Sequence, residues 1–116
     1  MIQLDLKCAQ AGQELAQIPG VDEKLLNSAL AVLQEQGLYA CFLYLRAQGK
    51  EAIEVSKQLF GFLRNIPSLH LTPNDDQMLE AVAQLSEDLD RLLFAREVLL
   101  QALTYARYHL KAKGGG

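Results

Sequence analysis

Lys and Arg residues recur at helical spacing in two segments of this chain, and such rows are suited to binding phosphate groups. The two rows are Lys50, Lys57 and Arg64, and Arg96, Arg107 and Lys111. Members of the first row are seven residues apart, so they return nearly to one line of a helix. Members of the second row fall within about 60° of one another at about 100° per residue. Cations spaced one or two turns apart follow a strand of phosphates without reading its bases, so these are the candidate RNA-binding residues.

The same two rows also have a purely structural interpretation. Basic residues late in a helix complement the helix dipole, and long charged side chains solvate an outer face. Tyr105 and Tyr108, close to Arg107 in sequence, are equally ambiguous. Aromatic rings stack on bases, but on an apolar helix they more often belong to a core or an interface. The residues alone leave both interpretations open.

Acidic residues are concentrated in residues 72–90, which contain no Lys or Arg. They are Asp75, Asp76, Glu80, Glu87, Asp88 and Asp90. Residues 91–113 carry five basic residues against Glu97 alone. The surface is therefore expected to be polarised, and the acidic segment is either a solvated face or a face that docks on a basic partner.

Motifs for catalysis or for binding a metal or a cofactor are absent from the sequence. It contains no glycine-rich phosphate loop, no Ser, His and Asp arranged as a triad, and no carboxylate and histidine spacing suited to a metal. The pair Asp75-Asp76 falls at an expected helix start, where the helix dipole explains it. Cys8 and Cys41 are far apart in sequence and are expected to be buried free thiols. We therefore expect no enzyme activity, no metal and no cofactor.

One spacing resembles a catalytic signature. Five residues separate Arg64 from His70, as in the motif of the HEPN ribonucleases, which are small helical domains. In that family the motif lies on one helix, whereas Pro67 prevents the segment here from being helical. The spacing leaves a small ribonuclease as the weakest of the alternatives.

The rows must be positioned by helices, because half of the 116 residues are hydrophobic, helix-forming types dominate and only 3 are Pro. We expect an all-α fold, a compact bundle of about five helices in a single domain over residues 1–113, followed by a disordered glycine tail at 114–116. Apolar periodicity places the helices at about residues 4–18, 22–48, 50–65, 74–85 and 87–111. Their expected N-caps include Asp22, Thr72 and Ser86. Gly37 lies inside the second helix, where a close helix crossing is the favoured explanation and a kink the alternative.

Neither a membrane segment nor a secretory signal is expected. The longest apolar run, residues 38–45, is far shorter than the roughly 20 residues that span a bilayer. The first residues lack a basic start followed by an apolar run. A cytoplasmic location follows as the expectation.

Two segments carry a family resemblance. The first is residues 33–43 (LQEQGLYACFL), followed by a turn at Gly49-Lys50, and the second is residues 93–100 (LFAREVLL), leading to Tyr105-Ala106-Arg107. Together they resemble the small subunit of type III-B CRISPR effector complexes, the Cmr module. In that family an apolar helix with a Gly-Leu step precedes a closing Arg-Glu helix with an aromatic and basic end.

The resemblance implies a non-catalytic scaffold subunit. Copies of such a subunit stack into an inner filament beside the backbone subunits, beneath the large subunit, and line the channel that holds guide RNA and target RNA. The acidic face of one copy is suited to meet a basic face of the next. A helical adaptor that binds only protein is the main alternative, and salt dependence of RNA binding separates the two.

Overall fold

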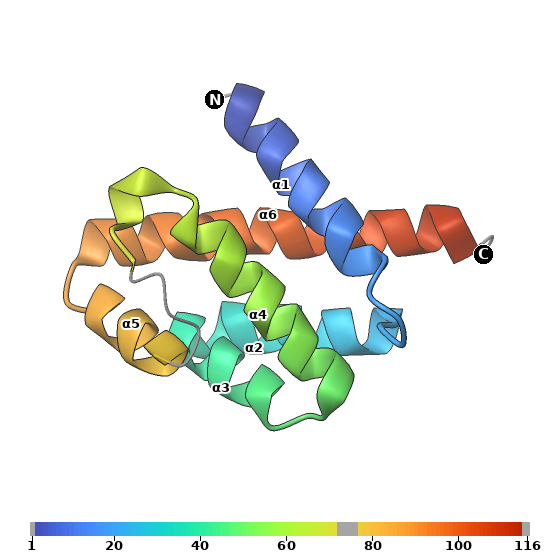
Figure 1. The fold of residues 1–116 in the computed structure, drawn as a ribbon, viewed down its shortest axis with the longest axis horizontal. Coiled ribbons are helices and arrows are strands. Elements are labelled where there is room, and N and C mark those ends of the chain that lie inside the picture. Colours follow the sequence, from blue (N-terminus) through green and yellow to red (C-terminus); the bar gives the residue numbers. More distant parts are fainter. Residues whose placement is uncertain (1, 72–76, 115–116) are drawn as a thin grey trace.

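The computed structural model describes residues 2–71 and 77–114, which form a single all-helical globule (Figure 1). These residues contain no strand. They form six α-helices and a short 3-10 helix: α1 (Ile2–Ala16), α2 (Glu23–Gln36), α3 (Leu38–Arg46), α4 (Lys50–Arg64), η1 (Pro67–Leu69), α5 (Met78–Leu85) and α6 (Leu89–Gly114). The all-α prediction is confirmed, and the described part has one helix more than the number expected.

Helix α6 is the longest helix among the described residues. It runs along the whole longest dimension of the molecule, which measures 42 Å, and both α1 and α2 pack against it (Figure 1). Helix α3 connects this layer to α4 and α5. The buried residues of α6 recur at spacings of three and four and therefore form one stripe along the helix: Ala95, Val98, Leu99, Ala102, Leu103 and Ala106.

Helices α1 and α6 cross closely at Gly12. A β-carbon at Gly12 would lie 2.7 Å from the main-chain nitrogen of Ala106 and 2.8 Å from the carbonyl oxygen of Ala102. Only glycine lets the two backbones approach this closely. The buried residues Cys8 and Ala16, four positions before and after Gly12, continue the same row of small side chains.

The expectation of a close crossing at Gly37 is wrong. A β-carbon there would meet nothing within 4 Å, and Gly37 instead has φ 103° and ψ −175°, a conformation essentially confined to glycine. This residue ends α2 and begins α3, so the single helix expected over residues 22–48 is two helices. The kink alternative was closer to the structure. Gly49 has nearly the same conformation, with φ 111° and ψ −176°, and it separates α3 from α4.

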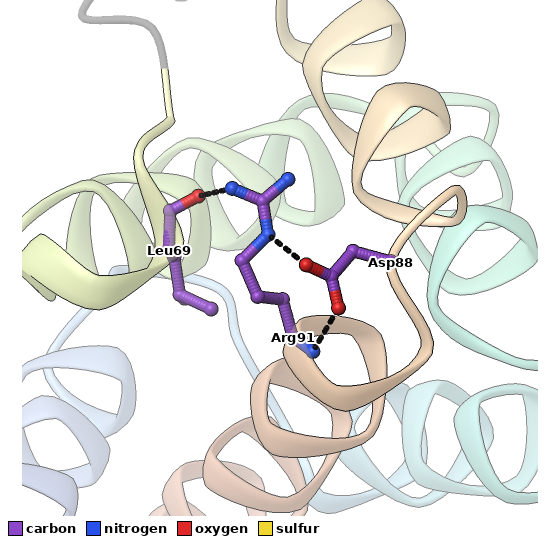
Figure 2. Close-up of polar contacts among 3 residues, drawn as sticks. All are labelled: Leu69, Asp88 and Arg91. Atoms are coloured by element: carbon purple, nitrogen blue, oxygen red, sulfur yellow. Dashed lines mark hydrogen bonds and ion pairs between the residues drawn. The ribbon is translucent and has the colours of Figure 1, made fainter.

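The helix caps confirm one prediction and correct another. Asp22 caps α2, because its Oδ1 accepts a hydrogen bond of 2.9 Å from the Leu25 amide. Ser86 does not cap α6: it ends α5, and its hydroxyl donates to the Val82 carbonyl. The cap of α6 is Asp88, whose Oδ1 accepts from the Arg91 amide at 3.2 Å (Figure 2). The expected start at Thr72–Asp75 lies outside the described residues.

The two ends of the long helix also differ from expectation. Helix α6 includes Gly114, which was expected to belong to the tail, while residues 115 and 116 lie outside the described part.

Within the described residues no helix is both long enough and apolar enough to cross a membrane. Helix α6 has 26 residues, but Arg and Glu side chains interrupt its apolar sequence.

Candidate nucleic-acid interface

The basic row on α4 is accessible. Lys50 begins the helix and Lys57 lies two turns later, and both side chains are exposed. Neither lysine makes an ion pair with any residue that the structure describes. Arg64, the last residue of α4, is half-buried, and its guanidinium lies 5.4 Å from the centre of the Phe60 ring. The exposed Glu54 shares this face of α4, between the two lysines, and reduces its positive charge.

The basic row on α6 lies against α2. Arg96 Nη2 donates a hydrogen bond of 3.2 Å to the Gln34 carbonyl, one of the unpaired carbonyls in the last turn of α2. Lys111 Nζ lies 4.0 Å from Glu23 Oε1, at the first residue of α2. Between them, Arg107 is half-buried, and its Nε is buried without a hydrogen-bond partner. Two of the three cations in this row therefore contact α2, one near each end of that helix.

The two rows do not belong to one helix pair. Helix α4 packs against α1 and α3 and has little contact with α6, whereas the α6 row contacts α2. The sequence could not distinguish them, because both rows consist of Lys and Arg that return to one face of a helix. The difference lies in which helix has a neighbour on its basic face.

The tyrosines near Arg107 in sequence point elsewhere. Tyr105 and Tyr108 pack edge to face, with ring centres 6.5 Å apart. The β-carbon of Tyr105 lies at the crossing with Gly12, so this ring is placed by α1. Tyr108 is 61% exposed. The pair is thus on the α1 side of α6, about 100° or more around the helix from Arg107.

The acidic residues have two different environments. Glu80, Glu87 and Asp90 are exposed, while Asp75 and Asp76 lie outside the described residues. Asp88 is used structurally: besides capping α6, its Oδ2 lies 3.3 Å from Arg91 Nε. That contact is an ion pair without hydrogen-bond alignment.

Arg91 has a structural role that its sequence position did not predict. Its guanidinium pairs with Asp88 and also donates a hydrogen bond of 3.2 Å to the Leu69 carbonyl, which joins the start of α6 to η1 (Figure 2). The spacing of three between Asp88 and Arg91 was the available signal. No sequence pattern indicated the contact between Arg91 and Leu69, because the two residues are 22 positions apart.

Arg64 and His70 do not share a helix. Helix α4 ends at Arg64, and His70 follows η1 with φ 53°, in the left-handed region. As expected, the α-helix does not continue through Pro67, but the segment is not wholly non-helical, because Pro67–Leu69 form the 3-10 helix η1.

Both cysteines are buried free thiols, as predicted. Burial raises the pKa of Cys8 to about 11, with smaller contributions from the Asp5 and Glu97 carboxylates. Burial raises the pKa of Cys41 to about 12. Neither thiol is therefore activated. In the part of the chain that is described, no three His, Cys, Asp or Glu side chains are grouped to hold a metal ion.

A groove between α1 and α4 was not predicted. Its cavity volume is about 660 Å³, and Arg64 forms part of its wall. Both helices were expected, but a groove depends on the angle between them, which the sequence does not specify.

Comparison with protein-family models, with curated proteins and with solved structures finds no match to this chain. The assignment of a function therefore depends on the geometry of the described residues and on the resemblance of the two segments.

Proposed function

We propose that this chain is a non-catalytic small structural subunit of a type III CRISPR RNA-guided effector complex, of the type III-B kind. It forms part of an inner filament that lines the channel for guide RNA and target RNA, in the cytoplasm. The single observation that carries RNA contact is the row on α4, where Lys50 and Lys57 are exposed and form no ion pair with a described residue.

The geometry of this row suits a nucleic-acid backbone. A spacing of seven residues along a helix separates neighbouring cations by about 10 Å, which is close enough for one strand to contact more than one of them. The Phe60 ring holds Arg64 in place at the end of the row. Phosphate contacts of this kind give affinity without sequence preference, as a channel for many different RNAs requires.

The α6 row contributes less to this proposal. Arg96 and Lys111 contact α2, so binding of RNA by either side chain competes with a contact inside the fold. We therefore assign the phosphate contacts first to Lys50, Lys57 and Arg64, and only secondarily to Arg96, Arg107 and Lys111.

The exposed acids support contact between copies. Glu87 and Asp90 lie at the start of α6, and a basic face on a neighbouring copy complements them in a heterologous contact. Charge reversal at Glu87 and Asp90 is expected to prevent filament assembly without unfolding the chain. Asp88 is unsuitable for this test, because it caps α6. Unchanged assembly of the doubly reversed variant would exclude this face from the contact.

The experiment that tests the function is affinity purification of the tagged chain from its host, with identification of the proteins and the RNA recovered. A large particle with short, uniform guide RNA supports the proposal. Lys50→Gln/Lys57→Gln is expected to reduce the RNA recovered, whereas Lys24→Gln/Lys113→Gln, which removes the same charge from exposed lysines elsewhere, is not. For purified chain and single-stranded RNA, affinity falls with salt, and loss of two phosphate contacts should make the slope of log affinity against log salt less negative by about 1.4.

A protein-only adaptor is the second candidate, and the contacts of Arg96 and Lys111 with α2 favour it, because they give the α6 row a structural use. Recovery of protein partners without RNA would establish the adaptor and refute RNA binding.

A further inference from the structure

The groove between α1 and α4 has two ends. At the end that we call narrow, Gly20, just after α1, packs on the Glu51 side chain near the start of α4. The opposite end, which we call wide, lies between the first half of α1 and the end of α4. The cavity between them, about 660 Å³, is within the range of small-ligand sites.

Charge and polarity vary along this groove. Lys7, from the first half of α1, and Arg64, from the end of α4, contribute cations to the wide end. Glu14 and Gln58 line both the groove and a small hollow beside it toward Pro19, so they mark the narrow end. Phe62 contributes a half-buried aromatic ring to the wall between the two ends.

Gln58, in the wall of the groove, carries a buried polar atom. Its Oε1 accepts no hydrogen bond from any residue that the structure describes. A buried acceptor without a donor is costly and uncommon in folded proteins, so it calls for an explanation. The oxygen itself is covered, and it would face the groove after a rotation of the amide that breaks no described hydrogen bond of Oε1. A ligand that offers an N–H group at the narrow end would supply the missing donor.

We propose that this groove binds one unstacked nucleotide of the RNA strand that follows the α4 row. Its phosphate lies between Lys7 and Arg64, its base lies against Phe62, and its exocyclic amine donates to Gln58 Oε1. This inference rests on the proposed function.

Two features favour a nucleotide over a peptide as the occupant. Arg64 belongs both to the α4 row and to the wall of the groove, so a strand on the row reaches the wide end. Amide side chains recognise the edges of unstacked bases, while aromatic rings stack on their faces. Gln10 and Asn65 add two further amides to the opposite walls of the groove.

The proposal predicts base preference. Cytosine presents an exocyclic amine where uracil presents a carbonyl, so oligo(rC) of 12 nucleotides should bind at least about fivefold more tightly than oligo(rU) of the same length. Gln58→Met removes the acceptor and should abolish this ratio by weakening oligo(rC) alone. Gln84→Met, on the exposed face of α5, should preserve the ratio. Thermal unfolding of each variant shows that the fold is intact, and the side-chain amide resonance of Gln58 should shift with oligo(rC) but not with oligo(rU).

The possible results separate the two proposals. Equal binding of both oligonucleotides, or a preference that survives Gln58→Met, overturns the nucleotide site. If binding in that case still weakens in Lys50→Gln/Lys57→Gln, the proposed function stands. Absence of RNA both from the purified particle and from the binding assay refutes both proposals. A Gln58 resonance that responds to a copurified protein and to neither oligonucleotide makes the groove a protein-docking site and overturns the inference.

Discussion

The α1–α6 crossing makes Gly12→Ala a sensitive test of the packing. The added methyl group would lie 2.7 Å from Ala106 N and 2.8 Å from Ala102 O, about 1 Å inside ordinary contact distance. These are main-chain atoms of a long helix, so no side chain can rotate away to relieve the contact. The two helices would have to separate, which would disturb the neighbouring small residues as well.

The expected loss follows from two opposing effects. Overpacking a well-packed core costs about 1–3 kcal/mol, and contact with main-chain atoms places Gly12→Ala at the upper end or beyond. Alanine is favoured over glycine inside a helix by about 1 kcal/mol, which offsets part of this cost. The free energy of unfolding should therefore fall by about 2 kcal/mol or more, with a midpoint of thermal unfolding lower by roughly 8 °C.

Gly61→Ala is the matched control. Gly61 is also inside a helix, but a β-carbon there would lie 3.6 Å from Arg64 Nη2, an ordinary contact. The same substitution should therefore raise the free energy of unfolding by about 0.5–1 kcal/mol through helix propensity. Urea unfolding monitored by circular dichroism measures both variants. If Gly12→Ala is as stable as the wild type or as Gly61→Ala, the close approach of α1 and α6 is wrong.

Three further predictions concern caps, turns and thiols. Asp88→Ala should lower the free energy of unfolding by about 1 kcal/mol, because it removes the cap of α6. Ser86→Ala should lower it by clearly less, because Ser86 bonds only within α5. If urea unfolding shows the larger loss for Ser86→Ala, Ser86 is the cap instead. Gly37→Ala should cost about 1–3 kcal/mol through its backbone conformation alone, and unchanged stability would contradict that conformation. The raised pKa values of Cys8 and Cys41 mean that the folded state holds both thiol protons more tightly than the unfolded chain. Their contribution to stability is therefore complete below pH 9.0, the ordinary thiol pKa, and is lost as the pH rises from there toward about 11–12. Stability of the wild type relative to Cys8→Ala/Cys41→Ala should fall between pH 8 and pH 11, and a constant difference would show that the thiols are not buried.

Local patterns predicted most of the helices. Apolar spacing located α1 and α4, Gly49 separated two helices, and Asp22 was recognised as a cap, because each of these features depends on neighbours within a few residues. The choice between Ser86 and Asp88 was missed, since both residue types cap helices and the decision depends on where the last turn of α5 ends.

Features that depend on two distant helices were beyond the sequence. Gly12 and Gly37 each lie within an apolar helical pattern, and only the position of α6 shows that Gly12 is the one at a crossing. The six candidate cations were found by spacing, but their burial and their contacts with α2 were not predictable. The groove was missed for the same reason, because it lies between α1 and α4 and depends on how these two helices pack.

The two basic rows show why charge spacing alone does not identify a binding surface. Both rows follow the period of a helix, yet Arg96 and Lys111 already contact groups near the two ends of α2, the Gln34 carbonyl and the Glu23 carboxylate. No helix covers the lysines of α4, which keeps Lys50 and Lys57 exposed to any ligand. An exposed cation loses little on meeting a phosphate, whereas one engaged within the fold first loses that contact. The proposed RNA surface therefore belongs on α4 and the adjoining wall of α1, with the α2–α6 pair as the scaffold that supports it.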